Sequence, residues 1–285
     1  MVAGSGREKT YMCFDLKSFF ASVECVERGL DPFTTNLVVA DPSRGDRTIC
    51  LAATPAIKAL GAKSRGRVYE IPKGVEYIMA PPRMQLYIDY SARIYGIYLR
   101  YAAKEDIHIY SIDEVFMDAT AYMGARGMTP LEFARAVMRD VYAETGITAT
   151  CGIGTNLYLA KIALDVISKR SPEFIGVLTE ESYRELLWDH TPLTDFWHIN
   201  VGTVGRLAHL GIRTMRELTQ TDEAILYKTF GVDAQLLIDH AWGRESVGIA
   251  DIKSYSPHSS SLSTGQVLHC GYGVAGARLL MLEMA

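Results

Sequence analysis

The chain has 285 residues, of which 48% are hydrophobic and 22% are charged, and its formal net charge is −4. This composition is ordinary for a globular protein, and the length allows two or three domains with cores of their own. No apolar run reaches the ~18 residues of a membrane helix, and the N-terminus lacks the apolar stretch of a signal peptide. These features exclude a membrane-spanning protein. The mild negative charge argues only weakly against a nucleic-acid partner, because a local basic channel can coexist with an acidic exterior.

The cysteines indicate a reducing compartment. They are five in number, scattered, and mostly within apolar runs, so neither a disulfide framework nor a zinc site fits their spacing. We therefore expect reduced thiols in a cytoplasmic protein. The residues concerned are Cys13, Cys25, Cys50, Cys151 and Cys270.

In chain order, the first part of the sequence alternates strands and helices. A buried strand over 11–15 precedes a helix over 17–28 whose apolar residues recur at helical spacing. A turn-rich loop over 41–46 then separates two short strands, 36–40 and 48–53, and a short helix over 56–60 ends at Gly61. The further elements that we predict are a helix over 83–101, strands over 107–110 and 115–118, a helix over 130–144, a strand over 148–153 and a helix over 156–168.

The connection between the strands at 107–110 and 115–118 determines the fold class. It is a tight turn, and a tight turn joins antiparallel strands, whereas parallel strands need a long crossover. The sheet is therefore mixed or antiparallel, and we predict an α+β core, not a doubly wound one.

From about residue 171 the pattern becomes helical. Short helices with small connections run from 180 to 242, and the segment 197–216 has the spacing of helix, turn and helix. Such a unit suits backbone amides that face a phosphate. A polar linker follows Gly243.

The carboxylates give the chemical signal. Asp113 and Glu114 are adjacent at the tight turn, and Asp15 ends the first strand. Two anionic side chains at one rim of a sheet repel each other unless a divalent cation neutralises them. The sequence thus predicts a two-metal phosphoryl-transfer site, whereas an Asp–Glu pair alone would more often be an exposed turn.

Four motifs resemble those of the Y-family (translesion, UmuC/DinB-like) DNA polymerases. The first is the strand–acid–helix start over 13–24, and the second is Ser111-Ile112-Asp113-Glu114. The third is Gly152-Ile153-Gly154-Thr155-Asn156 with the helix that follows it, and the fourth is the helix-hairpin-helix-like segment over 197–212. They occur in the order of that family across residues 10–245.

The resemblance implies a metal site and its ligands. Asp15, Asp113 and Glu114 match the catalytic carboxylates of the family, and the Leu16 carbonyl matches a further metal ligand. Two Mg²⁺ ions are implied as cofactors, with Mn²⁺ as a substitute. One ion would activate the primer 3′-hydroxyl and the other would hold the triphosphate.

The resemblance also implies contacts to nucleotide and DNA. Phe20 matches the steric gate that excludes a 2′-hydroxyl, and Phe19 precedes it. Lys58 and Lys161 match residues that bind the triphosphate. At the thumb hairpin, the implied DNA contacts are Asn200, Gly202 and Thr203.

Several positions depart from the family. Lys58 stands where an arginine is usual and loses its bidentate fork. Pro55 and Ala52 replace a tyrosine and a threonine whose hydroxyls contact the triphosphate. His198-Ile199-Asn200 replaces the Gly-Ile-Gly of the thumb hairpin, and histidine tolerates a left-handed backbone less readily than asparagine.

The implied architecture has four parts. The palm comprises 1–19 and 84–170 and contains an inserted fingers domain, 20–83. The all-helical thumb with its helix-hairpin-helix covers 171–243, and 244–285 is a linker with the first strands of a truncated little finger. Loss of most of that domain would remove phosphate contacts.

The expected function is template-directed addition of deoxynucleotides to a primer, with translesion synthesis in DNA repair and the SOS response as the family role. The partners are primer–template DNA, deoxynucleoside triphosphates and a sliding clamp. Two alternatives stay open: a weak or inactive DNA-binding member of the family, and another palm-type enzyme such as a nucleotidyl cyclase.

Overall fold

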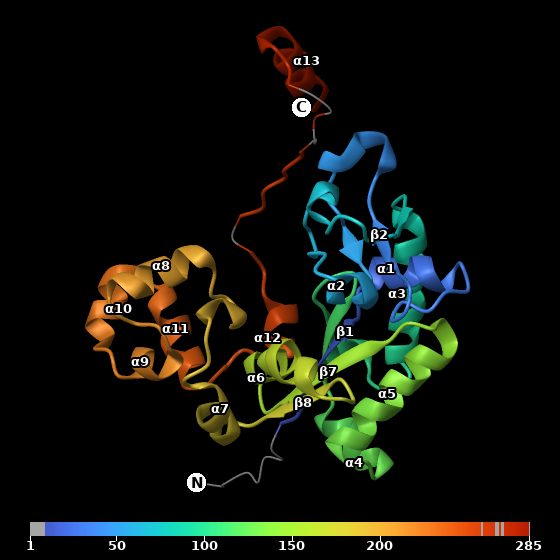
Figure 1. The fold of residues 1–285 in the computed structure, drawn as a ribbon. Helices are drawn as coiled ribbons and strands as arrows, with labels where there is room; N and C mark the ends of the chain where they lie inside the picture. The colour runs from blue at the N-terminus through green and yellow to red at the C-terminus, as the bar shows by residue number, and fades with distance from the viewer. Residues whose placement is uncertain (1–8, 258, 266–267, 269–270, 285) are drawn as a thin grey trace, which may run out of the picture.

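The fold is built on a five-stranded sheet in a computed structural model that describes residues 9–257, 259–265, 268 and 271–284. The strand order is β5-β6-β1-β7-β8 (Figure 1). All neighbours are antiparallel except β7 and β8, which are parallel. The predicted α+β class with a mixed sheet is confirmed. The strands are β1 Tyr11–Leu16, β5 Ile107–Ile109, β6 Glu114–Asp118, β7 Ala149–Gly154 and β8 Ile175–Leu178.

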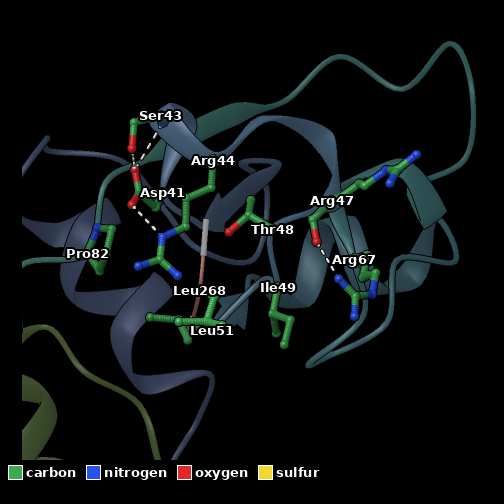
Figure 2. A pocket seen from close by; sticks show the side chains of 10 residues that line it. All are labelled: Asp41, Ser43, Arg44, Arg47, Thr48, Ile49, Leu51, Arg67, Pro82 and Leu268. Atoms are coloured by element: carbon green, nitrogen blue, oxygen red, sulfur yellow. Dashed lines mark hydrogen bonds and ion pairs between the residues drawn. The ribbon is translucent and has the colours of Figure 1, made fainter. Parts of the chain in front are cut away.

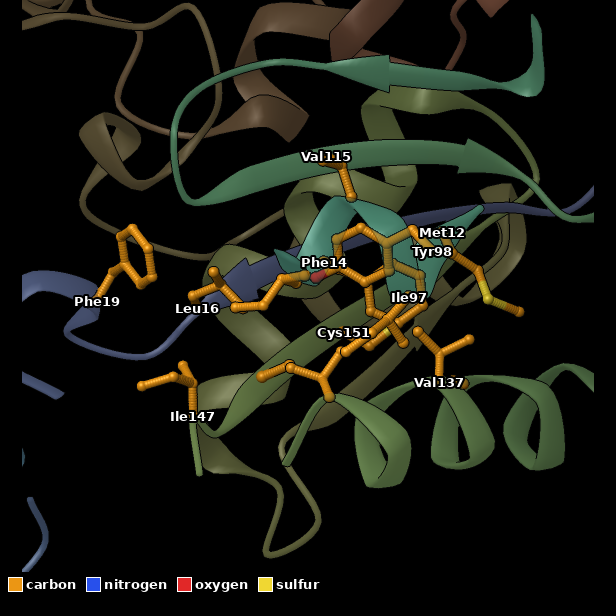
Figure 3. Close-up of a cluster of buried hydrophobic side chains, with 14 of the residues drawn as sticks. Met12, Phe14, Leu16, Phe19, Ile97, Tyr98, Val115, Val137, Ile147 and Cys151 are labelled. Atoms are coloured by element: carbon orange, nitrogen blue, oxygen red, sulfur yellow. The ribbon is translucent and has the colours of Figure 1, made fainter. Parts of the chain in front are cut away.

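The central strand β1 sends alternate side chains to opposite faces of the sheet. Met12, Phe14 and Leu16 enter the main hydrophobic core. Figure 3 shows them beside Tyr98 and Val137, which lie on α3 (Met84–Tyr98) and α5 (Pro130–Thr145). These two helices cover one face. α5 starts at Pro130 behind a capping box made by Thr129 and Glu132.

The other face of β1 carries Tyr11, Cys13 and Asp15. Tyr11 and Cys13 pack against α6 (Leu157–Ile162) and α12 (Ile249–Ser254). After α6 the chain makes a π-helical turn, Ala163–Ile167, and a short 3-10 turn. Asp15 therefore lies at the end of the face that α6 and its π-turn cover.

The fingers form a small sheet of their own, with strand order β3-β2-β4. β2 (Leu37–Val39) pairs with β3 (Ala52–Ala53) antiparallel and with β4 (Ile78–Ala80) parallel. α2 (Pro55–Ala59) packs against this sheet through Ile57. The predicted turn-rich loop contains a 3-10 helix, Pro42–Arg47, and the predicted strand over 48–53 shortens to two residues.

The thumb is helical, and its buried residues form one cluster with Tyr158, Leu159 and Ile162 of α6. Figure 1 shows it on one side of the palm. Trp197 joins the two parts, because its indole nitrogen donates to the Tyr110 hydroxyl at 3.1 Å and its ring packs on Phe116. The helices are α7 Glu180–Leu187, α8 Val201–His209, α9 Met215–Thr219, α10 Glu223–Phe230 and α11 Asp233–Ala241.

Two predicted domain boundaries need correction. β8 pairs with β7, so the palm sheet continues to Leu178 and does not end at 170. α1 (Phe19–Val26) buries Phe19, Ala21 and Val23 in the same core as β1. It therefore belongs with the palm as much as with the fingers that were expected to start at residue 20. α4 (Thr120–Arg126) was not predicted.

The C-terminal region also differs from expectation. The linker forms α12, and Ile249 packs against β1 and β6. Instead of strands, the described part of 253–285 contains α13 (Val274–Met284), which has no buried residue and stands apart in Figure 1. Gln266 and Val267, within the expected opening of the little finger, lie outside the described residues, as does Cys270.

The other predicted cysteine thiols, Cys13, Cys25, Cys50 and Cys151, are free and buried. Within the described ranges, no helix has the length and hydropathy to cross a lipid bilayer.

Candidate active site

The strand register brings the predicted carboxylates together. Asp15 pairs directly with Glu114 across β1 and β6, so the two side chains point to the same face of the sheet. Asp113 precedes β6, and its carbonyl accepts a hydrogen bond from the Leu16 amide at 2.9 Å. Ser111 donates its hydroxyl proton to the Asp113 carboxylate at 2.7 Å. The acidic turn and the end of β1 thus form one corner.

Glu114 is held by a buried lysine. Lys161 Nζ lies 2.8 Å from Glu114 Oε1 and 3.1 Å from Asp165 Oδ2, and the side chains of Lys161 and Glu114 are both 9% exposed. The Cys13 thiol donates to the same oxygen, Glu114 Oε1, at 3.2 Å. Burial raises the pKa of Glu114, and Lys161 partly offsets that rise.

The surroundings of Asp15 disfavour its negative charge. Burial, followed by the charges of Asp113 and Glu114, raises the pKa of Asp15 to about 7. A divalent cation would relieve this repulsion, and carboxylate oxygens are the donors that Mg²⁺ prefers. The donor chemistry therefore fits a metal site. In the described part of the chain, however, no three acidic, histidine or cysteine side chains are arranged to hold an ion, since Glu114 is turned to Lys161.

A basic pocket adjoins Asp15. It measures roughly 350 Å³. Lys58 Nζ donates to the Ser18 hydroxyl at 2.8 Å. Burial lowers the pKa of Lys58, and Lys17 lowers it further. Closely spaced lysines of this kind suit a polyanionic ligand. The lining residues are Asp15, Lys17, Ser18, Pro55, Lys58, Thr150, Leu164, Asp165, Ser168 and Lys169.

The structure separates the two predicted phosphate lysines. Lys58 lines the pocket. Lys161 does not: it is 7% exposed and is ion-paired with Glu114. Lys17 and Lys169 line the pocket and were not predicted. Asp165 lies in the π-helical turn after α6 and Lys169 in the 3-10 turn that follows, and both line this pocket. A deviation of that kind leaves no clear mark in a single sequence.

The two phenylalanines at the start of α1 have different environments. Phe19 is 2% exposed and belongs to the core. Phe20 is partly buried and stacks on Tyr87, with ring centroids 4.4 Å apart and an angle of 13° between the planes. The Tyr87 hydroxyl donates to buried Glu24 at 2.7 Å, and Arg83 pairs with the same carboxylate. Tyr87, itself held by Glu24, thereby fixes the position of the Phe20 ring.

The thumb hairpin begins α8. Asn200 caps the helix, accepting from the Thr203 amide at 2.9 Å and from its hydroxyl at 3.3 Å. Thr203 is buried, and a Cβ atom added to Gly202 would meet only the Asn200 side chain. The left-handed residue of the hairpin is His198, with φ 66°, and Asn200 is extended. The helix starts at Val201, later than the expected segment start at residue 197.

A second pocket lies elsewhere, in the fingers, and measures roughly 630 Å³. Figure 2 shows Arg44 turned to Asp41, and Arg67 bonded to the Arg47 carbonyl. Leu268, from the segment before α13, lines the same pocket. It shares no lining residue with the pocket beside Asp15.

Comparison with known proteins gives consistent results. A model of the impB/mucB/samB family matches residues 14–165. The "Putative UV-damage repair protein UvrX" of Bacillus subtilis is 35% identical over 82% of this chain and 55% of its own length. "DNA polymerase IV 2" of the same organism is 33% identical over 91% of this chain and 60% of its own length.

Solved structures agree in fold. A Y-family DNA polymerase chimera of Dbh and Dpo4 matches 84% of this chain and 69% of its own length, with a TM-score of 0.72 and 25% identity. DinB from Sulfolobus solfataricus matches 87% of this chain and 68% of its own length, with a TM-score of 0.66 and 26% identity. The chain spans a little over half the length of the curated relatives it matches.

Proposed function

This chain belongs to the impB/mucB/samB family, the UmuC/DinB-like group of Y-family DNA polymerases, and from that membership we propose that it extends a DNA primer. The reaction is template-directed transfer of a deoxynucleotide to the primer 3′-hydroxyl, with pyrophosphate as the leaving group. Translesion synthesis in DNA repair is the corresponding role. Primer–template DNA and deoxynucleoside triphosphates are the partners, and a sliding clamp is a further candidate.

In this proposal the acidic corner is the metal site. Asp15, Asp113 and Glu114, with the Leu16 carbonyl, would hold Mg²⁺, and Mn²⁺ could take its place. Bound divalent ions supply a lowered pKa for the attacking hydroxyl and charge neutralisation at the phosphates. The chain's own contribution is to hold the carboxylates on one strand pair, so that little reorganisation is needed during the reaction.

Glu114 must leave Lys161 to become a ligand. Asp165 already accepts from Lys161 at 3.1 Å, so the ammonium retains a partner when Glu114 turns away. Without that second partner, the buried ammonium would be left unpaired, which is strongly unfavourable. Lys161 is therefore better suited to controlling Glu114 than to binding the triphosphate.

The pocket beside Asp15 is the proposed triphosphate site. Lys58 and Lys169 approach it from the fingers and from the palm, which supports binding of phosphate groups. Phe20, supported by Tyr87, is the proposed steric gate, because a ring fixed beneath the sugar leaves no space for a 2′-hydroxyl. Phe19 contributes its backbone only, since its side chain is in the core.

The thumb hairpin is the proposed DNA contact. Asn200 and Thr203 are engaged with each other, so their role is to shape the start of α8, next to Gly202. The amides at the start of a helix attract phosphate oxygens. Binding through few phosphate contacts predicts an affinity that falls steadily with salt.

The observation that carries the proposal is the pairing of Asp15 with Glu114 beside a pocket with three lysines. The test is primer extension by the purified 285-residue chain, with Mg²⁺ and separately with Mn²⁺, on templates that differ in the next base. Incorporation that follows the template base supports the proposal. No extension with either metal, or addition that ignores the template, overturns it.

A further inference from the structure

Phe174, whose ring contacts the pocket-lining residue Lys17, has an unusual backbone conformation. It precedes β8 with φ 58°, in the left-handed region that aromatic residues rarely occupy. Its amide donates to the Ser171 carbonyl at 3.1 Å, and its carbonyl accepts from the Cys151 amide at 2.9 Å. The second bond ties the strained residue to β7 of the palm sheet, and the first closes the turn before β8. Such strain persists only where the surroundings fix it, and it is concentrated at functional sites.

The Phe174 ring contacts the side chain of Lys17. Lys17 Nζ lies 4.3 Å from the ring centroid, within the range of a cation–π contact. Phe33 stacks on the same ring, with centroids 6.2 Å apart and an angle of 21° between the planes. The Lys17 backbone is fixed as well, since its amide donates to the Thr148 carbonyl at 2.9 Å. Lys17 is therefore held at its backbone by Thr148 and at its ammonium group by Phe174.

Lys17 lines the pocket beside Asp15 without a carboxylate partner among the ion pairs of the described residues. Lys17 is partly buried. Pro55 also lines the pocket, and it has no hydroxyl to offer a phosphate oxygen. Lys17 thus offers a positive charge in a pocket where Pro55 provides no hydroxyl contact.

We infer that Lys17 binds a phosphate group of the incoming nucleotide and that Phe174 is its positioning residue. This inference rests on the proposed polymerase function. The ring holds the ammonium at the pocket wall before the nucleotide arrives, so less side-chain freedom is lost on binding. The assignment adds a third basic contact to Lys58 and Lys169.

The test measures equilibrium binding of a non-hydrolysable α,β-imido deoxynucleoside triphosphate to the chain on primer–template DNA. Lys17→Met keeps the bulk of the side chain and removes its charge, so we expect binding to weaken by about ten- to hundredfold. Lys17→Arg keeps the charge and should bind within about threefold of the original chain. Lys104→Met, at an exposed lysine outside the pocket, is the matched control and should change nothing.

Phe174→Leu tests the positioning role. It keeps an apolar side chain but removes the ring face, so we expect weakening of about two- to fivefold. In the Lys17→Met background the same substitution should have no further effect, because it acts through Lys17. A role in stability alone would give additive effects. Thermal melting of each variant shows that the fold is retained.

The outcomes separate this inference from the proposed function. If the original chain binds the nucleotide and Lys17→Met binds it equally well, the inference is overturned while the polymerase proposal stands. If Phe174→Leu weakens binding equally with and without Lys17, Phe174 does not act through Lys17. If the original chain does not bind the nucleotide at all, the proposed function fails, and this inference fails with it.

Discussion

At the acidic corner, negatively charged carboxylates lie close to one another and to the positively charged Lys161. Asp15 is destabilised by burial and by its acidic neighbours, whereas Glu114 is stabilised by Lys161. The identities of these acids could be predicted from the sequence, because each one ends or begins an apolar strand. The ion pair of Lys161 with Glu114 and Asp165 could not, since it depends on the depth at which α6 lies on the sheet.

The raised pKa of Asp15 makes stability depend on pH. Between the unfolded value of 3.8 and the folded value of about 7, the native chain holds a proton that the unfolded chain has lost. The free energy of unfolding therefore falls as pH rises through this window. Asp15→Asn removes the charge, so its gain in stability over the original chain should be small at pH 4 and on the order of 2–4 kcal/mol at pH 8.

Thermal or urea unfolding at both pH values, with EDTA present, measures this difference. Excess Mg²⁺ at pH 8 provides the control, because metal binding stabilises the chain that retains the carboxylate and should shrink the gain. An equal gain at pH 4 and pH 8 would show that Asp15 does not bear a buried charge.

At the scale of elements, the contact between β7 and α6 positions the site. A Cβ atom added to Gly152 would lie 2.1 Å from the Ala160 carbonyl oxygen, and one at Gly154 would lie 2.3 Å from the Ala160 amide nitrogen. Gly176 on β8 has the same relation to Ala163. These glycines let the helix and its π-turn lie directly on the sheet. Lys161 thereby reaches Glu114.

We expect Gly152→Ala to be severely destabilising. The clash is with backbone atoms, which cannot move aside, so the loss should be about 3 kcal/mol or more. Gly96→Ala is the matched control: that glycine lies in α3 with no atom within 4 Å of the added Cβ. Its stability should rise by roughly 0.5–1 kcal/mol. Denaturant unfolding of both variants measures the contrast, and a mild effect at Gly152 would refute the close packing.

The predictability of the elements follows their length. The strand at 11–15 and the helix at 130–144 have long, clear apolar periods and were predicted nearly to their ends. β3 was predicted over 48–53 but has only two residues, and β4, which has three, was not predicted, because so short a segment hardly shows an alternating pattern. The four residues of β8 follow a helix that ends irregularly, so their pairing with β7 depends on tertiary contacts.

At the scale of the whole molecule, the chain combines a palm, fingers and a helical thumb in one assembly. The thumb meets the palm where Trp197 contacts Tyr110, three residues before Asp113. The hairpin proposed to contact DNA and the acidic corner thus lie close in sequence to the two residues of this contact. The resemblance of four ordered motifs predicted this arrangement, but not the helices α12 and α13 at the end of the chain.

The central claim is that Asp113, with Asp15 and Glu114, performs the chemistry of primer extension. The most direct measurement compares the original chain with Asp113→Ala in primer extension with Mg²⁺, alongside the affinity of both for primer–template DNA. We predict that extension falls by at least about a thousandfold, because the metal ligands act as a unit, while DNA affinity changes by less than about threefold. Extension by Asp113→Ala at a rate near that of the original chain would contradict the account.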